Sequence, residues 1–462
     1  MYKENGSAVL VMLTKRDRHH GVSVRARWMM QTSIHVLAQA AQRDKSKSFR
    51  SLYSFLNRVT LAQAYHGLNK DAAPGVDRVT WESYGKNLEQ NLIDLETRLK
   101  NKRYFAHVVR RVTIPKENGK TRPLGIPALE DKLVQYVVRD LLEALFEPLF
   151  YKHSYAYRPH KSARQAVEEA RTQLMGKYKF VVEVDIKSFF DSINHDWLIK
   201  MIEVRVNDSA ITGLIRQWLK AGIKYDDGHV ENPEQGTPQG GVISPILANI
   251  YLHYVLDNWF QTAVKLECSM EATLVRYADD FVVAFRSEKD ANWFFSELPG
   301  RFAKFGLKLS EDKTRKIRFT RFDKDGSGTF DFLGFNFRWG VSRKGHDVVL
   351  TRTSGKKIHK TINEFAKWIK ENRNKPVRWI MQRVKSKLLG HKNYFGIQGN
   401  SERVWQIMRA YERLLYKWLN RRSQRRSYSW GAFREMISFY NVRSSARIGN
   451  NGVQMSFMSL LF

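Results

Sequence analysis

The sequence of 462 residues predicts a mixed α/β protein whose C-terminal part is entirely helical. Segments with apolar residues at helical spacing alternate with short runs of β-branched and aromatic residues up to about residue 345. Beyond that point the pattern is helical, basic and aromatic. These shifts divide the chain into a basic N-terminal extension (1–50), a mixed region (51–345), a helical region (346–440) and a short tail (441–462).

The helices and strands of the mixed region are predicted from helical spacing of apolar residues and from short runs of β-branched and aromatic residues. Helical spacing predicts helices over 51–105, 129–150, 161–176 and 289–305, with a loop at DAAPGVDRVT. The predicted strands are a hairpin within 108–128 around the turn KENGKT, a strand in KYKFVVEVDIKSFFDSI, a hairpin at 275–285 and a β pair in GTFDFLGFNFRW. A Gly- and Pro-rich loop, ENPEQGTPQGGVISP, precedes the predicted helix ILANIYLHYVLDNWF.

The charge of the chain indicates a polyanionic partner. The formal net charge is +32, from 78 Lys and Arg against 46 Asp and Glu. Such an excess fits nucleic acid, an anionic membrane surface or an acidic protein. No stretch approaches the roughly 18 apolar residues of a membrane span, and the N-terminus lacks a signal-peptide pattern. We therefore expect nucleic acid and no membrane.

The single cysteine, Cys268, excludes several kinds of site. One thiol cannot build a disulfide framework or a zinc site that needs two thiolates. A reducing, cytoplasmic location fits this cysteine usage.

Three aspartates stand at the ends of apolar strands. Asp279 and Asp280 are adjacent within VRYADDFVVAF, and Asp185 follows the strand VVEV. Asp is rare in strands and neighbouring carboxylates repel each other, so a cation would stabilise the arrangement. Carboxylates suit Mg²⁺, and two such ions about 3.5–4 Å apart can promote phosphoryl transfer. Singly, these residues also fit a hairpin turn or a strand-end cap; together, in a basic chain, they favour a metal site.

The aspartates lie in motifs that resemble those of reverse transcriptases. YADD resembles the YxDD box, and VDIKSFFDSI resembles the first metal-binding motif. IPKENGKTRPLGIP, YAYRPHKSA, QGTPQGGVISPILANIYL, GLKLSEDKT and FLGF resemble the other motifs, in family order over about 72–340. AAPGVDRVTWESY and the segment 394–433 resemble bacterial group II intron-encoded reverse transcriptases, also called maturases. The form QGxxxSP at 239–245 argues against diversity-generating enzymes.

The resemblance implies a right-hand polymerase, with mixed α/β fingers and palm, an antiparallel palm sheet and an all-helical thumb or maturase region. It implies RNA-directed DNA synthesis by an enzyme that also binds its intron RNA, assists its splicing and supports its mobility. The implied partners are intron RNA, an RNA template, a DNA primer or target and dNTPs, with the protein a monomer or homodimer.

The resemblance also assigns the chemistry of the site to individual residues. Asp185, Asp279, Asp280 and the Ile186 carbonyl would hold two Mg²⁺ ions, for which Mn²⁺ could substitute. Lys313 would protonate the pyrophosphate leaving group, with a surface lysine as the alternative reading.

Four further residues are assigned to the incoming nucleotide. Lys116 and Arg122 would contact its triphosphate, unless their hairpin is simply a solvated basic surface. Phe190 would exclude a 2′-hydroxyl and so select dNTPs, unless it is a core residue. Gln239 would contact the nucleotide or the template.

Nucleic-acid contacts are expected at seven positions. These are Arg158, Lys161, Gly240, Arg421, Arg422, Arg425 and Arg426. The last four belong to RRSQRR, which ends a predicted helix. Because the helix dipole alone favours positive charge there, RNA contact and a solvated helix end both stay open.

Two other functions share these motifs. A splicing-only RNA-binding cofactor is disfavoured by the three aspartates, which a pure RNA binder does not need. A domesticated relative acting in DNA repair or phage defence stays open as an alternative, which the presence or absence of a flanking intron RNA beside the gene would decide. Since the chain ends about 30 residues after the maturase-like segment and has one cysteine, we expect no endonuclease domain.

Overall fold

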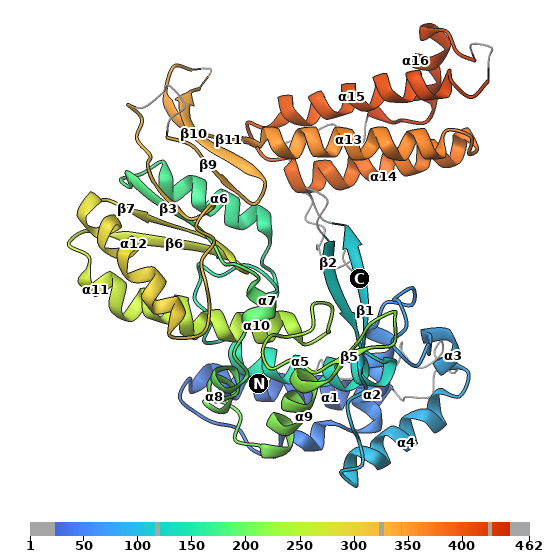
Figure 1. The fold of residues 1–462 in the computed structure, drawn as a ribbon, viewed down its shortest axis with the longest axis vertical. Helices are drawn as coiled ribbons and strands as arrows, with labels where there is room; N and C mark the ends of the chain where they lie inside the picture. Colours follow the sequence, from blue (N-terminus) through green and yellow to red (C-terminus); the bar gives the residue numbers. More distant parts are fainter. Residues whose placement is uncertain (1–23, 116–120, 323–327, 343, 424–426, 444–462) are drawn as a thin grey trace, which may run out of the picture. The chain divides into compact units, whose positions relative to one another are not determined.

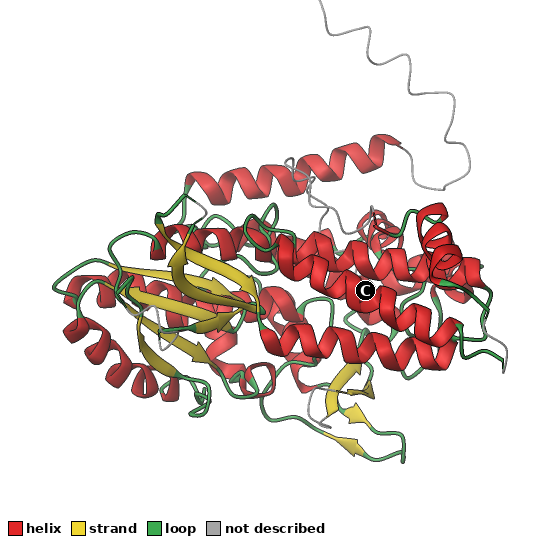
Figure 2. Cartoon of the chain, turned by 90° about the horizontal axis from the view of Figure 1, so that it is seen from above, coloured by secondary structure: helices red, strands yellow, loops and turns green. Residues whose placement is uncertain are grey.

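The computed structural model describes residues 24–115, 121–322, 328–342, 344–423 and 427–443. Helices predominate, and the longer strands are gathered into three sheets (Figure 2). The chain divides into two compact units, the first from 1–150 and 188–254 and the second from 151–187 and 255–461. None of the described helices is long and apolar enough to cross a membrane.

The first unit surrounds a central helix, α5 (Leu129–Phe146), which contacts α1, α2 and α10 and is buried along most of its length. Its sheet has the order β2-β1-β4-β5. β1 and β2 lie side by side (Figure 1) and form the hairpin predicted within 108–128. The other elements of this unit are α1 (Val24–Arg43), η1 (Leu52–Phe55), α2 (Arg58–Gly67), α3 (Trp81–Gly85), α4 (Leu88–Lys100), β1 (Val109–Pro115), β2 (Thr121–Ile126), α7 (Phe189–Ser192), α8 (His195–Glu203), α9 (Ser209–Lys220), β4 (Ile223–Lys224), β5 (Val230–Glu231) and α10 (Ser244–Leu252).

The second unit holds two antiparallel sheets and the C-terminal helices. A π-helix, η3 (His253–Asp257), follows α10, and the chain enters the second unit within this π-helix. Its elements are α6 (Ala163–Leu174), β3 (Phe180–Asp185), η4 (Phe260–Val264), α11 (Lys265–Glu267), β6 (Ala272–Tyr277), β7 (Asp280–Phe285), α12 (Glu288–Ala303), β8 (Arg315–Arg318), β9 (Phe330–Phe332), β10 (Phe335–Val341), β11 (Asp347–Thr353), α13 (Gly355–Asn372), α14 (Val377–Phe395), α15 (Ser401–Leu419) and α16 (Trp430–Phe439).

The larger sheet of this unit has the order β6-β7-β3-β8, with every neighbouring pair antiparallel. On one face, Phe281 and Phe285 pack on α12, with ring centroids 6.0 Å from Phe302 and 5.2 Å from Phe294. Val282, which points to the opposite face, joins the apolar cluster that includes α6. Helices thus cover both faces, which explains why the strands are continuous apolar runs. The predicted antiparallel sheet is confirmed.

The smaller sheet corrects one prediction. Residues 347–353 were expected to be helical, as part of 346–440, but they form β11. β11 pairs with β10 from Val341 opposite Asp347 to Phe335 opposite Thr353. Its sequence, DVVLTRT, is rich in β-branched residues, which favour a strand once a partner is present. The helical region therefore begins at Gly355.

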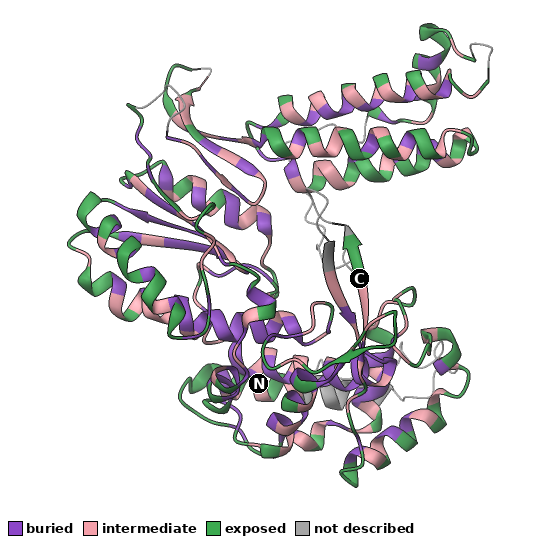
Figure 3. Ribbon diagram, viewed as in Figure 1, coloured by how far each residue is buried: buried purple, intermediate pink, exposed green. Residues whose placement is uncertain are grey.

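The C-terminal helices α13, α14 and α15 pack together along one side of each helix (Figure 3). Phe365 of α13 and Tyr411 of α15 stack with ring centroids 3.6 Å apart. Basic residues such as Lys367 and Lys370 occupy the exposed side. Each helix is thus amphipathic, as its sequence period predicts, and the predicted helical C-terminal region is confirmed from Gly355 onward.

Candidate active site

Asp279 lies at the tip of a tight hairpin. Tyr277, the last residue of β6, pairs with Asp280, the first of β7, so that only Ala278 and Asp279 form the turn. Ala278 has φ 55°, in the left-handed region that residues with a Cβ avoid. Such strain costs on the order of 1 kcal/mol, and the paired strands must compensate for it.

Asp185 lies directly across the sheet from this turn. It is the last residue of β3, and its register partner on β7 is Asp280. Directly opposed residues of antiparallel strands have Cβ atoms roughly 4.5–5.5 Å apart. The fold thus brings the predicted aspartates to one end of the sheet. Within the described ranges, no three Asp, Glu, His or Cys side chains are grouped so as to hold a metal ion.

The electrostatics of the site fit a cation. Burial raises the pKa of Asp280 to about 7; the backbone N–H of Leu333, which donates to Oδ2 at 3.3 Å, opposes this rise, and the carboxylates of Asp279 and Asp185 add to it. A carboxyl group in this state gains much from a nearby positive charge. Together with Asp185 and the Ile186 carbonyl, it offers the oxygen ligands that divalent cations such as Mg²⁺ prefer.

The motif GLKLSEDKT holds the segment that follows β3. Ile186 forms a bridge with Leu309, and the backbone N–H of Ser310 donates to the carbonyl of Asp185 at 2.8 Å. This pairing brings Lys313 to the site, where its Nζ lies 2.9 Å from Oδ2 of Asp185. The predicted lysine and the predicted aspartate are therefore in contact.

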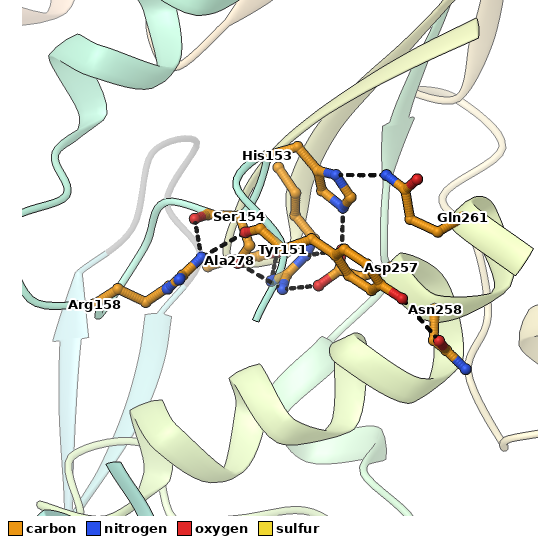
Figure 4. A network of polar contacts seen from close by, with 9 residues as sticks. Tyr151, His153, Ser154, Arg158, Asp257, Asn258, Gln261 and Ala278 are labelled. Atoms are coloured by element: carbon orange, nitrogen blue, oxygen red, sulfur yellow. Dashed lines mark hydrogen bonds and ion pairs between the residues drawn. The ribbon is translucent and has the colours of Figure 1, made fainter. Parts of the chain in front are cut away.

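A network of polar contacts that includes Asp257 and Ala278 lies next to the turn that carries Asp279 (Figure 4). Arg276 and Asp257 are both fully buried, and Nε and Nη2 of Arg276 donate to the two carboxylate oxygens at 2.8 and 2.5 Å. Nη2 also donates to Ser154 Oγ at 2.7 Å, and Nη1 donates to the carbonyl of Ala278 at 3.2 Å. Burial alone would raise the pKa of Asp257, but the Arg276 guanidinium and the contact with His153 together outweigh burial and hold this pKa well below its usual range.

The partners of this pair come from distant parts of the chain. Asp257 ends the π-helix η3, and His153 Nε2 lies 3.3 Å from its carboxylate. π-Helical turns are rare and frequently occur at functional sites. Sequence reasoning missed both Arg276 and Asp257, although a lone charge inside each apolar segment, LVRY and YVLDNW, was an available signal.

The motif FLGF connects the aspartates to the C-terminal helices. Leu333 and Gly334 both have positive φ, 52° and 79°, which makes a sharp turn. The Leu333 N–H donates to Asp280, and its carbonyl accepts a hydrogen bond from the Tyr394 hydroxyl of α14 at 3.1 Å. One backbone residue thus links a helix of the C-terminal bundle to Asp280.

The predicted nucleotide-binding residues lie in the first unit. Phe190 is 8% exposed and its carbonyl accepts from the Thr237 N–H at 2.8 Å, which ties α7 to the Gly-rich loop. The Gln239 carbonyl accepts from the N–H of Gly125, on β2, at 2.7 Å. Arg122 also belongs to β2, opposite Ile114. Lys116 lies outside the described residues.

Gly240 is required by packing. Its φ is 118°, and a Cβ added there would lie 2.8 Å from the carbonyl oxygen of Gly125. Any larger residue would push the Gly-rich loop away from β2. The glycine is therefore explained by the close approach of two backbones, independently of nucleic acid.

Several predicted RNA-binding cations contact the protein itself. Arg158 donates to the carbonyls of Tyr151 and Ser154 at 2.6 and 2.7 Å, and Arg422 donates to that of Lys375 at 2.9 Å. The ammonium of Lys161 lies 4.8 Å from the Tyr155 ring centroid, and the Arg421 guanidinium 5.8 Å from that of Trp418. Arg425 and Arg426 lie outside the described residues.

Comparison with known families shows what the segment that contains this site is similar to. Residues 114–337 match the family described as reverse transcriptase (RNA-dependent DNA polymerase). The range contains Asp185, the hairpin with Asp279 and Asp280, and the FLGF turn. This part of the chain is therefore similar to reverse transcriptase domains.

The curated relatives narrow the class further. The group II intron-encoded protein LtrA of Lactococcus lactis subsp. cremoris is 29% identical over 386 residues, covering 71% of this chain and 62% of that protein. Protein YkfC of Escherichia coli (strain K12) is 36% identical over 245 residues, 47% of this chain and 64% of that protein. The chain thus matches less than two thirds of the length of either relative. The resemblance to group II intron-encoded reverse transcriptases is confirmed.

Proposed function

We propose that the protein is an RNA-directed DNA polymerase encoded by a group II intron. The observation that carries the proposal is the register of β3 and β7, which sets Asp185 opposite Asp280 with Asp279 in the adjoining turn. Its substrates are dNTPs, an RNA template and a DNA primer. The primer 3′-hydroxyl oxygen bonds to the α-phosphorus, the bond to pyrophosphate breaks, and the hydroxyl proton is lost.

We assign Asp185, Asp279 and the Ile186 carbonyl as metal ligands, with Asp280 in support. Two Mg²⁺ ions, or Mn²⁺ in their place, would supply electrostatic stabilisation of the phosphates when bound. Lys313 would give a proton to the departing pyrophosphate. Its ion pair with Asp185, at 2.9 Å, supports this role because it orients the ammonium group at the site.

The nucleotide contacts are proposed on the first unit. Arg122 and Lys116 would bind the triphosphate, Gln239 the base or template, and Phe190 would pack under the sugar. The packing of the Gln239 loop on β2 supports this grouping, because that strand also carries Arg122.

We further propose that the protein binds its intron RNA and assists splicing. The net charge of +32 supports this, since phosphate contacts by Lys and Arg dominate nucleic-acid affinity. Arg158, Lys161, Gly240 and the RRSQRR segment are the proposed contacts, and residues from Gly355 onward the thumb or maturase region.

The decisive experiment is primer extension on an RNA template with Mg²⁺ and dNTPs. We expect Asp279→Ala to lower the extension rate by at least about 100-fold, because metal stabilisation of the phosphates supplies several kcal/mol. Asp226→Ala, which removes an exposed carboxylate from a surface turn, serves as the matched control and should extend normally. Template-primer affinity is measured in parallel. No extension by the unmodified protein, or an equal loss of affinity and extension in Asp279→Ala, would refute the assignment.

A further inference from the structure

A shallow hollow of about 170 Å³ lies between α15 and α16, within the second unit and distinct from the aspartates. Arg409 and Arg413 line it from α15, and Trp430 and Arg434 line it from α16. We call these four residues the basic hollow. Drug-sized ligands occupy pockets of about 300–1,000 Å³, so this volume suits one unit of a polymer.

The charges around the hollow are poorly balanced. Four arginines line it, with Glu412 as the acidic residue among the lining side chains. The Glu412 carboxylate is already paired with Arg443, whose Nε and Nη2 donate to its two oxygens at 2.7 and 3.3 Å.

The other three guanidinium groups have no acidic partner among the described residues. Arg409, Arg413 and Arg434 are exposed and form no ion pair with any residue that the structure describes. Like charges so close together repel one another, and an anion between them would remove that cost. Arginine is also the side chain best suited to phosphate, because its planar fork donates two parallel hydrogen bonds.

An aromatic platform forms one side of the hollow. Trp430 stacks on Tyr416 with ring centroids 3.7 Å apart and an interplanar angle of 12°. The buried Phe433 meets both rings edge-on. Trp430 is therefore fixed in orientation, yet 44% of it is exposed. A rigid exposed indole beside arginines can stack an unpaired base while the cations bind its phosphates.

We propose that the basic hollow binds a single-stranded segment of RNA, with one unstacked base on Trp430 and the adjoining phosphates on Arg409, Arg413 and Arg434. An acidic peptide would satisfy the arginines but would leave the indole without a planar partner. The choice of RNA as the nucleic acid rests on the proposed function. The basic hollow would add to the proposed RNA binding one specific contact that lies apart from the aspartates.

The test is fluorescence anisotropy of a labelled single-stranded oligouridine RNA with the full chain, without Mg²⁺ or dNTPs. Polymerase activity plays no part in this measurement. The binding assay therefore tests the basic hollow alone, and primer extension tests the polymerase proposal separately. We expect the triple variant Arg409→Ala/Arg413→Ala/Arg434→Ala to lose at least tenfold in affinity. Its log–log salt slope should become shallower by about 2, at roughly 0.7 for each phosphate contact.

Matched variants separate the two parts of the site. Trp430→Ala should weaken binding about tenfold with the salt slope kept, whereas Trp430→Phe should retain most of the affinity. The control triple Arg286→Ala/Lys289→Ala/Lys304→Ala removes the same charge from exposed positions in and beside α12. Thermal unfolding of every variant checks that the fold is intact.

Three results would overturn the proposal. The first is a loss in the hollow triple no greater than in the control triple. The second is an unchanged affinity in Trp430→Ala. The third is a loss of affinity in the hollow triple that is equally large for another nucleic acid of the same length. An equal loss for duplex RNA would exclude recognition of an unstacked base, and an equal loss for single-stranded DNA would exclude recognition of RNA in particular.

Discussion

Two adjacent aspartates in this protein have very different surroundings. Asp279 belongs to the turn between β6 and β7, whereas Asp280 opens β7 and accepts the Leu333 N–H. Burial raises the pKa of Asp280 to about 7. Because Asp279 lies in the turn and Asp280 lies in the paired strand, the two carboxylates have different environments. A metal held mainly by Asp279 and Asp185, with Asp280 in support, is consistent with this difference.

The proposed role of Phe190 in selecting the sugar of the nucleotide can be tested by a single substitution. Phe190→Ala should raise the ratio of rNTP to dNTP incorporation by at least about tenfold, because loss of the ring leaves room for a 2′-hydroxyl. It should also destabilise the fold by about 3–5 kcal/mol, since the side chain is buried. The measurement is kcat/KM for both nucleotides on one template.

The neighbouring residue supplies the control for this experiment. Phe189 is 2% exposed, and Phe189→Ala should cost similar stability without changing sugar selection. If both variants leave the ratio of rNTP to dNTP incorporation unchanged, Phe190 is a core residue and not a sugar gate.

At the scale of elements, contacts between segments determine how the turn is held. η3 supplies Asp257, β6 supplies Arg276, and α14 supplies Tyr394 through Leu333. Arg276 reaches the carbonyl of Ala278, the residue with the left-handed backbone. The buried ion pair therefore orients the hairpin that carries Asp279.

Breaking the ion pair should affect stability and activity differently. Arg276→Leu should destabilise the fold by roughly 3–5 kcal/mol, because it leaves Asp257 buried without its partner. The double variant Arg276→Leu/Asp257→Leu should recover much of that stability but extend primers slowly, since the Ala278 carbonyl has lost its donor. Urea unfolding and single-turnover extension measure the two effects. A double variant that is stable and fully active would show that Arg276 does not position the turn.

α14 contains a histidine that should make the C-terminal helices acid-sensitive. Burial, with a smaller contribution from the nearby Lys357 ammonium, lowers the pKa of His391 from 6.5 to about 4. The unfolded chain takes up this proton near pH 6.5 and the folded chain only near 4, so stability should fall as the pH drops through that interval. The loss is on the order of 2–3 kcal/mol.

Thermal unfolding between pH 7 and 4 checks this prediction. His391→Phe, which keeps an aromatic ring beside Phe395, should flatten the dependence, while His359→Phe at an exposed position should not. Parallel curves for the unmodified protein and His391→Phe would contradict it.

At the scale of the whole molecule, excess positive charge dominates. With a net charge of +32, template-primer binding should weaken steeply as salt rises. Six or more phosphate contacts would give a log–log slope of about −5 or steeper. Affinity measured at several salt concentrations by anisotropy gives this slope directly. A slope shallower than about −2 would contradict the basic-surface interpretation of the chain.

Much of the fold, and the three aspartates as candidates for the site, could be predicted from local sequence. Helical and strand periods depend on residues a few positions apart, so α5, α6, α12 and the hairpin at YADD were accessible to sequence analysis. The motif order likewise singled out Asp185, Asp279 and Asp280, which the structure places at one end of the sheet. β11 was missed because its short β-branched run becomes a strand only when β10 is beside it.

By itself, the sequence determined a basic mixed α/β protein, its apolar strands and the three aspartates in motifs that resemble those of reverse transcriptases. Only the tertiary structure decided what surrounds those aspartates. It joined Asp257 to Arg276, linked Asp280 through Leu333 to Tyr394, and gathered arginines around Trp430. The reason is physical: periodicity records which face of one element is buried, whereas these contacts join elements far apart in the chain and exist only after packing has chosen their neighbours.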